Sequence, residues 1–336
     1  MVSYAGEEVN ILGGGISGLA CAIILRKNGY AVNVYERRHS VGARFRNDWQ
    51  VIENWSEKND VLRQIGSDGI EPSFEYEPLC ELNLHYSGKT RLLQGKNVSY
   101  IVKRGNSKDS LDVNLLEQAT VSGVNVHFGS DPGKDIPMHI DATGPETPHV
   151  LARGITFTTD HENEYHMALG DRIAKGFYSY LVIKDGHGTM VTVFDRKYSR
   201  LSEAFLMNTG KCFAEYVNEK DLESGRKFGG YGNFEVGRKL YNENGAMRIG
   251  EAAGFQDFLF GFGMRYAFQS ASLAARSIMH EHPYEELVKD NLLQKLKHSK
   301  RNRFIFETMG TLAYPFTYYL LGANKDIRKL LYMIYR

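Results

Sequence analysis

Gly13-Gly14-Gly15-Ile16-Ser17-Gly18 follows the short, mostly apolar run at residues 9–12 and leads directly into the mostly apolar residues 19–29. An apolar run, a glycine-rich turn and a longer apolar segment in this order predict a strand, a tight turn and a helix. Asn28-Gly29 forms a suitable helix end, and residues 31–35 predict a second strand. This part of the chain is therefore expected to fold as a βαβ unit.

Each glycine of the G-x-G-x-x-G pattern has a physical role. Gly13 permits the tight turn, Gly15 lets a pyrophosphate approach the backbone, and Gly18 lets the helix pack closely on the strand. The helix start, next to Ile16 and Ser17 of the motif, supplies unpaired N–H groups and partial positive charge to phosphates. The pattern predicts a dinucleotide site, with a purely structural glycine turn as the alternative.

An acidic residue at the end of the second strand completes this pattern. Glu36 lies roughly 20 residues after the glycine turn, where a carboxylate accepts hydrogen bonds from ribose hydroxyls. Arg37-Arg38 and Val41-Gly42-Ala43-Arg44 follow. This continuation resembles the FAD-binding segment of the flavoprotein superfamily that includes glutathione reductase and p-hydroxybenzoate hydroxylase. The resemblance implies FAD as the cofactor, with Arg37 and Arg44 beside it; a solvated turn is the alternative for Arg37.

The composition limits the number of domains, the kind of partner and the cellular location that we expect. A chain of 336 residues with 42% hydrophobic and 24% charged residues is long enough for a large core and two domains. Lysine plus arginine (41) balance aspartate plus glutamate (40), so nucleic acid is not an expected partner. Three dispersed cysteines favour a reducing, cytoplasmic location and no metal site.

Two further segments extend the resemblance. Arg104 precedes residues 111–119, which match an apolar-Asp-x-x-Leu helix start, and residues 123–128 predict another strand of a parallel sheet. In the family this arginine reaches the flavin's polar edge or its diphosphate, so the resemblance implies that role for Arg104; a plain surface arginine is the alternative. Ile140-Asp141-Ala142-Thr143-Gly144 is similar to the family's D-A-x-G segment and implies that Gly144 lies near the cofactor.

The most informative segment is residues 247–255 (MRIGEAAGF), followed by residues 261–264 (GFGM) and an amphipathic stretch at 266–278. It resembles the G-D-A-A-G-F run, the G-x-G-I turn and the helix of geranylgeranyl reductases and related hydroxylases. The helix N-terminus would stabilise negative charge on a reduced flavin. The resemblance implies that the flavin is framed by Gly250, Glu251, Gly261, Gly263 and Met264. Glu251 departs from the pattern, because the family has an aspartate that binds a ribityl hydroxyl.

A second domain is expected between these segments. Residues 154–158, 177–183, 188–194 and 204–208 alternate apolar and polar side chains, which predicts an antiparallel sheet with one buried face. Phe177-Tyr178-Ser179-Tyr180-Leu181-Val182 is similar to the Y-x-W-x-F-P signature that lines the polyprenyl cavity of geranylgeranyl reductases. The resemblance implies that Tyr178 and Tyr180 contact the substrate; burial in the sheet's own core is an equal alternative.

These observations predict an α/β fold with a discontinuous Rossmann-type FAD-binding domain (residues 1–75, 100–145 and 245–282) and an antiparallel substrate domain (76–99 and 146–244). A helical C-terminal segment follows at 283–336. Its basic residues at 295–303 precede an aromatic stretch. That combination fits docking on a membrane surface, or a helical cap over the substrate domain. Residues 304–321 contain Glu307, Gly310 and Pro315 and do not predict a transmembrane helix.

The expected function is that of an FAD-dependent oxidoreductase acting by hydride transfer at the flavin on a hydrophobic substrate, with a polyprenyl or other lipid as one candidate. The same fold supports an NAD(P)H-dependent flavin monooxygenase of an aromatic substrate. A non-catalytic flavoprotein that binds lipid is the alternative from another class. No side chain is assigned as a catalytic acid or base, since the flavin itself carries the chemistry. His161, His166 and His187 lack a metal-ligand pattern.

Overall fold

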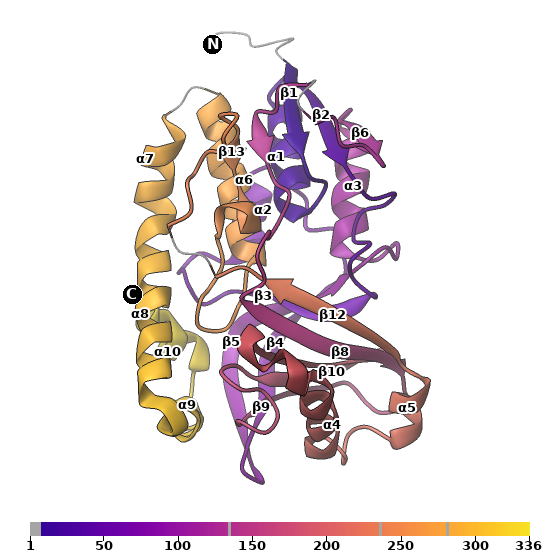
Figure 1. Ribbon diagram of the computed structural model, residues 1–336, viewed down its shortest axis with the longest axis vertical. Helices are drawn as coiled ribbons and strands as arrows, with labels where there is room; N and C mark the ends of the chain where they lie inside the picture. Colours follow the sequence, from indigo (N-terminus) through magenta and orange to yellow (C-terminus); the bar gives the residue numbers. More distant parts are fainter. Residues whose placement is uncertain (1–7, 134–135, 235–236, 280–281) are drawn as a thin grey trace.

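The computed structural model describes residues 8–133, 136–234, 237–279 and 282–336, which form two sheets and a flank of helices (Figure 1). Within these ranges the smaller sheet has five parallel strands in the order β13-β7-β1-β2-β6. Its strands are β1 Glu8–Leu12, β2 Ala31–Glu36, β6 Asn125–Phe128, β7 Ile140–Asp141 and β13 Met247–Arg248. The central position of β1 puts the glycine turn at the carboxyl edge of the sheet, where dinucleotides bind in such folds.

The helix after the glycine turn is buried on all sides. This helix, α1 (Ile16–Lys27), packs against α3 (Leu111–Val121) and α6 (Met264–Ile278). Every residue from Ile16 to Leu25 is buried, because the sheet and two helices surround it. The predicted strand, turn and helix are therefore confirmed, and the continuous apolar sequence of α1 reflects burial on every face.

The larger sheet lies beneath the parallel sheet in Figure 1. Its order in the described residues is β12-β8-β11-β10-β9-β4-β5-β3. Its strands are β3 Asp48–Glu53, β4 Tyr76–Tyr86, β5 Lys89–Arg104, β8 Val150–Thr158, β9 Glu164–Leu169, β10 Ser179–Lys184, β11 His187–Asp195 and β12 Arg226–Gly232. All neighbouring pairs are antiparallel except β4 and β9, which run parallel. The expected antiparallel sheet is thus observed with one parallel pair.

This sheet is curled, so that its edge strand β3 reaches β11. The backbone N–H of Trp49 donates to Thr189 Oγ1 at 2.9 Å, and the indole N–H donates to the carbonyl of His187 at 3.1 Å. Residues 48–53 fall within the range 1–75 that the sequence assigns to the FAD-binding domain, yet they pair with β5 of the larger sheet. The curl places β3 beside the cavity described below.

One predicted strand is wrong. Residues 204–208 lie inside the helix α4 (Ser202–Cys212), which packs on β11. Phe205, Leu206 and Thr209 are its buried residues, and they lie on one face of the helix. A run of about five apolar residues satisfies both periods, so alternation alone did not identify a strand here.

The C-terminal residues form a chain of helices along the outside of both sheets (Figure 1). The remaining helices are α2 Val61–Ser67, α5 Glu219–Ser224, α7 Tyr284–Val288, α8 Gln294–Met309, α9 Ala313–Gly322 and α10 Ile327–Ile334. Gly310, with φ of +55°, separates α8 from α9. The inner faces of α9 and α10 pack on β4 and β5. On this inner face the C-terminal segment is therefore a helical cap over the larger sheet. No helix among the described residues is long and apolar enough to cross a bilayer.

Candidate functional site

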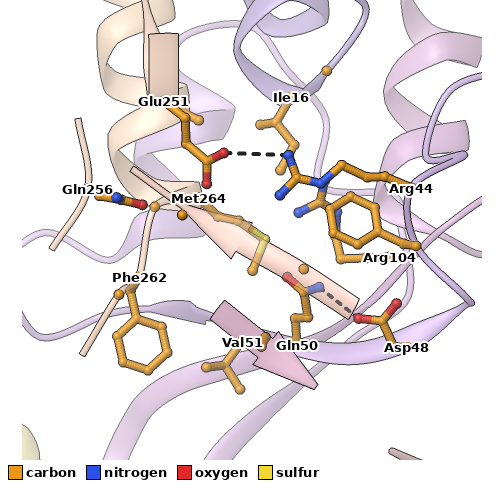
Figure 2. A pocket seen from close by; sticks show the side chains of 18 of the residues that line it. Ile16, Arg44, Asp48, Gln50, Val51, Arg104, Glu251, Gln256, Phe262 and Met264 are labelled. Carbon is orange, nitrogen blue, oxygen red and sulfur yellow. Dashed lines mark hydrogen bonds and ion pairs between the residues drawn. The ribbon is translucent and has the colours of Figure 1, made fainter. Parts of the chain in front are cut away.

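A cavity of about 760 Å³ separates the glycine turn from the larger sheet (Figure 2). The loops after β1, β2 and β7 line one side, together with the segment between β13 and α6. Strands β3, β10 and β11 line the other side, and Leu321 of α9 and Leu331 of α10 close one end. A cavity of this volume is in the range that binds a cofactor or another small molecule.

The glycines of the turn are required for two different reasons: close packing at Gly13 and Gly18, and open space at Gly15. Gly13 has φ of +107°, and a Cβ atom there would lie 2.3 Å from the carbonyl oxygen of Ala142. A Cβ at Gly18 would lie 2.0 Å from the carbonyl oxygen of Gly13. A Cβ at Gly15, in contrast, would meet no atom within 4 Å. The first two positions therefore serve the fold, while Gly15 leaves room for a ligand against the backbone.

The start of α1 faces this room. Gly15 is the N-cap residue, and no side chain of the described residues caps the helix. Ile16 and Ser17 line the cavity. The first N–H groups of a helix have no partner within it, and the helix dipole adds partial positive charge. This end of the cavity is thus suited to an anion such as a pyrophosphate.

Glu36 holds the turn from the end of β2. Its Oε2 accepts a hydrogen bond from the N–H of Gly14 at 2.9 Å, and its Oε1 accepts one from the N–H of Arg38 at 2.8 Å. Glu36 and Arg37 both line the cavity. The carboxylate therefore stands at the edge of the cavity and holds the backbone on both sides of it.

Arg44 and Glu251 meet across the cavity although 207 positions separate them in the sequence. Arg44 Nη1 lies 3.5 Å from Glu251 Oε2, and Figure 2 shows the two side chains pointing toward each other. The guanidinium of Arg44 also lies 4.9 Å from the ring centre of Phe45. The structure thus brings together two residues that the sequence placed at the flavin from separate motifs.

Arg104 lines the cavity with its guanidinium already paired. Its Nε and Nη2 donate to the two carboxylate oxygens of Asp112 at 2.8 and 2.9 Å, and Phe45 lies 4.1 Å from the guanidinium carbon. Burial opposes the charge of Arg104, but the carboxylate of Asp112 outweighs it and raises the pKa. Asp112 is the aspartate of the helix-start pattern, so that pattern encodes a buried ion pair. A plain surface location for Arg104 is wrong.

The segment before α6 turns at glycines, of which Gly261 and Gly263 line the cavity and Gly250 is buried against α1. Gly250 and Gly261 have φ of +58° and +87°, values that other residues rarely adopt. A Cβ at Gly250 would lie 2.7 Å from Ser17 Oγ, which shows how closely this segment packs on α1. Gly263 is the N-cap of α6, and Met264 extends into the cavity (Figure 2). The start of α6 therefore offers a second set of N–H groups to a ligand.

Gly144 also borders the cavity. It follows β7 with φ of +89°, and a Cβ atom there would meet no atom within 4 Å. Asp141 at the end of β7 accepts a hydrogen bond from Thr143 Oγ1 at 2.7 Å. The D-A-x-G segment thus turns at the cavity edge and leaves it open.

The end of the cavity away from the glycine turn is aromatic and apolar. The ring of Tyr178 stacks on that of Phe262, with centres 6.3 Å apart and planes at 21°. The Tyr180 hydroxyl donates a long hydrogen bond of 3.4 Å to the carbonyl of Trp49. Burial raises the pKa of both tyrosines, which keeps them neutral. Further apolar lining comes from Leu93, Val98, Val193, Phe234, Leu321 and Leu331.

Sequence reasoning missed a polar pair on β3. Asp48 is buried, and its carboxylate accepts hydrogen bonds from the N–H of Arg46 at 2.9 Å and from Gln50 Nε2 at 2.7 Å. Burial raises the pKa of Asp48 despite these bonds. Figure 2 shows Gln50 extending into the cavity with its oxygen directed away from Asp48. Two polar residues at i and i+2 share one strand face, which was the signal available in the sequence.

A second missed residue is Asp257, which supports the cavity from behind. This buried carboxylate accepts hydrogen bonds from the Tyr335 hydroxyl at 2.8 Å and from the N–H of Phe260 at 2.6 Å. The Ser299 hydroxyl on α8 is a further donor. Asp257 thereby ties the C-terminal helices to the loop that carries Phe262. Burial raises its pKa, the hydrogen bonds notwithstanding.

The histidines do not form a metal site among the described residues. His166 is buried and its Nδ1 lies 3.0 Å from Nε2 of His85. Burial lowers the pKa of His166 to about 4, although the carboxylate of Glu164 lies 2.9 Å from its Nε2. His187 is exposed and His161 is half-buried.

Comparisons with known proteins define the class of fold. A family model of the NAD(P)-binding Rossmann-like domain matches residues 11–61, which contain the glycine turn and Glu36. No curated protein matches the sequence significantly. The matched region agrees with the βαβ unit that the sequence predicts.

Solved structures extend the likeness to nearly the whole chain. A geranylgeranyl bacteriochlorophyll reductase-like protein from Thermoplasma acidophilum has a TM-score of 0.72 at 17% identity, covering 96% of this chain and 93% of its own. A flavoprotein/dehydrogenase from Cytophaga hutchinsonii gives 0.66 at 17% identity, with 98% and 91% covered. A flavin-dependent brominase gives 0.64 at 14% identity, with 98% and 93% covered. The chain has the fold that these three proteins share, as the resemblance predicted.

Proposed function

We propose that this chain binds FAD and acts as a flavin-dependent oxidoreductase on a hydrophobic substrate. The observation that carries the proposal is the continuity of the cavity, which joins an open glycine turn and two helix starts to an aromatic, apolar end. The related folds include a reductase-like protein, a dehydrogenase and a brominase, two of which are described as flavin proteins. The cavity matches what an elongated cofactor with a charged half and a planar half needs.

The residues present fit this cofactor. Gly15 leaves space at the backbone for the diphosphate, and the uncapped start of α1 donates N–H groups to it. Glu36 follows the glycine turn by roughly 20 residues, the spacing at which an acidic residue binds the adenosine ribose in such motifs. Arg37 and Gly144 border the same path, whereas Gly250 is buried against Ser17 of α1.

The flavin half would lie between Arg44 and the start of α6. Glu251 would accept a hydrogen bond from the ribityl chain, and its pairing with Arg44 fixes where its oxygens stand. The N–H groups after Gly263 would stabilise negative charge on a reduced flavin. Arg104 lies in the cavity wall, where Asp112 and the ring of Phe45 hold its guanidinium in place, and it would position the wall beside the flavin. When bound, the flavin supplies hydride transfer.

The substrate would bind at the apolar end. Tyr178, Tyr180 and Phe262 present rings to this part of the cavity, and Leu321 and Leu331 close it. Apolar walls favour a substrate with little polar surface, such as a polyprenyl or other lipid chain. NAD(P)H is the candidate reductant. The proposed setting is the cytoplasm.

Two other functions use the same cavity. The aromatic wall at Tyr178 also suits an aromatic substrate, as for an NAD(P)H-dependent flavin monooxygenase. Glu251 stands where the family has an aspartate. This difference is the feature that favours the second alternative, a flavoprotein that binds lipid without catalysing a reaction.

The test begins with the visible absorption spectrum of the purified protein after incubation with FAD. We expect a flavin spectrum that is retained through gel filtration; a colourless protein would contradict the proposal. Lipid extraction and mass spectrometry of the bound material then identify the ligand. NADPH oxidation that consumes oxygen and is stimulated by a phenol would favour the monooxygenase over the reductase.

A further inference from the structure

The outer surface of the C-terminal helices exposes many large apolar side chains. Of the fourteen such side chains that are strongly exposed in the described part of the chain, half lie between residues 293 and 333. They are Leu293, Phe304, Ile305, Leu312, Phe316, Tyr319 and Met333. Phe304 is 68% exposed and Leu312 67%, so neither packs on the protein. Scattered apolar residues need no explanation, but a concentration of them marks an interaction surface.

Their arrangement gives the surface two parts. On α8, Lys297, Lys300, Arg301 and Phe304 recur at intervals of three and four residues, so they share one face. The opposite face of α8 is buried through Leu296, Ser299 and Asn302. We call Lys297, Lys300 and Arg301 the basic stripe. The apolar tip consists of Phe304, Ile305, Leu312 and Phe316, which flank the turn at Gly310.

Positive charge is concentrated in the same segment. Residues 289–336 contain ten lysines and arginines against three aspartates and glutamates, a formal charge of +7, whereas the whole chain carries +1. The rest of the chain therefore carries −6. Two of the three acids already have partners, since Glu307 pairs with Arg303 at 2.8 Å and Asp326 accepts from the N–H of Lys329. Within the described part of the chain, no acidic side chain forms an ion pair with the basic stripe, so its cations can meet negative charge outside the protein.

We propose that the basic stripe and the apolar tip dock this protein on the surface of an anionic lipid bilayer. Exposed aromatic and aliphatic side chains next to lysine and arginine are the combination that binds such an interface, because the rings enter the acyl boundary while the cations remain at the headgroups. A protein partner or a nucleic acid would match the charge but would not require several unpacked apolar side chains at a helix turn.

The docked helices also form part of the cavity wall. Leu321 of α9 and Ile327 and Leu331 of α10 line the cavity from the inner faces of these helices, while Phe316 of α9 faces outward. Docking would thus bring the apolar end of the cavity next to lipid. This link rests on the proposed function, whereas the docking itself does not.

Vesicle sedimentation tests the docking. Full-length protein incubated with FAD is mixed with phosphatidylcholine vesicles, or with vesicles in which about a third of the lipid is phosphatidylglycerol. We expect binding to the anionic vesicles at least about tenfold stronger than to the neutral ones, and weaker in high salt because counter-ions screen the attraction. The double variant Phe304→Ser/Phe316→Ser and the double variant Lys300→Glu/Arg301→Glu should each bind about tenfold more weakly.

The control is Val121→Ser, because Val121 is 89% exposed on α3, far from this surface in the sequence. This variant should bind like wild type, and thermal unfolding of every variant checks that each is folded. Equal binding of all variants, or none by wild type, would overturn the proposal. A concentration-dependent dimer in gel filtration that Phe304→Ser/Phe316→Ser abolishes would assign the surface to a second copy instead. The flavin spectrum of the same samples reports separately on the proposed cofactor.

Discussion

The glycine turn at residues 13–18 and the aromatic wall at Tyr178 border one cavity but are built in different ways. The turn comes from six consecutive residues, and its ligand would meet backbone N–H groups and space left by missing side chains. The wall is assembled from β3, β10, the loop before α6 and the C-terminal helices, and its ligand would meet side chains. Recognition by backbone is therefore local in sequence, while recognition by side chains depends on packing across the whole chain.

The largest expected effect comes from Gly15→Val, which separates the ligand role of the turn from its structural role. A Cβ at Gly15 meets no atom within 4 Å, so the fold tolerates it, but the valine fills the proposed phosphate space. We expect FAD affinity, measured by titration calorimetry, to fall by more than about 100-fold, or about 2.7 kcal/mol. Thermal unfolding of the cofactor-free protein should be nearly unchanged.

Gly66→Ala is the matched control, since Gly66 lies in the short helix α2 with no atom near its would-be Cβ. It should bind FAD like wild type. Normal FAD affinity in Gly15→Val would show that the turn does not receive the diphosphate.

The next largest effect concerns the wall built from side chains, which Asp257 connects to the C-terminal helices. Asp257→Ala leaves the buried hydroxyls of Ser299 and Tyr335 and the N–H of Phe260 without their acceptor. We expect the free energy of unfolding to fall by about 2.5 kcal/mol, measured by urea denaturation. Tyr332→Phe, three positions before Tyr335 and half-buried, should change it by less than about 0.5 kcal/mol. A stable Asp257→Ala variant would mean that the C-terminal helices do not depend on this carboxylate.

The His85–His166 pair predicts how the larger sheet responds to pH. Burial lowers the pKa of each histidine from the usual 6.5 to about 4, and His166, with its Nδ1 3.0 Å from His85 Nε2, further lowers the pKa of His85. A depressed pKa in the folded state contributes stability above pH 6.5 that is lost as the pH falls from 6.5 toward 4. We expect a loss of about 2 kcal/mol over this window.

Denaturation midpoints at several pH values measure this loss, and His85→Gln should flatten the dependence. His187→Gln is the control, because that side chain is exposed. An unchanged pH profile in His85→Gln would show that the pair is not what titrates.

The smallest effect concerns Gln50, whose amide is oriented by the carboxylate of Asp48. Asp48 accepts a hydrogen bond from Gln50 Nε2, so the amide oxygen of Gln50 is directed to the cavity as an acceptor (Figure 2). We expect wild type to prefer a naphthol over its methyl ether by about fivefold, and Gln50→Leu to lose that preference, a difference of about 1 kcal/mol. Binding is followed by quenching of tryptophan fluorescence. Retention of the preference by Gln50→Leu would exclude this contact, while FAD affinity serves as the control.

Several elements were predictable because their signals are local. The βαβ unit, the helix at 266–278 and the glycine turns at 250 and 261 follow from short motifs whose residue types are dictated by turns and close approaches. The helix at 204–208 was mistaken for a strand, because a short apolar run fits both periods and only its contact with β11 decides between them.

The sequence alone determined the strand, the glycine turn and the helix, because backbone geometry and side-chain size act within a few residues. Only the tertiary structure decided that Arg44 meets Glu251, that Arg104 pairs with Asp112 and borders the cavity, and that Asp257 binds Tyr335. The contacts of Arg44 with Glu251 and of Asp257 with Tyr335 join residues far apart in the chain, and they depend on how the sheets and the C-terminal helices pack. Arg104 and Asp112 are close in sequence, but only the packing of the two sheets decides that their pair borders the cavity.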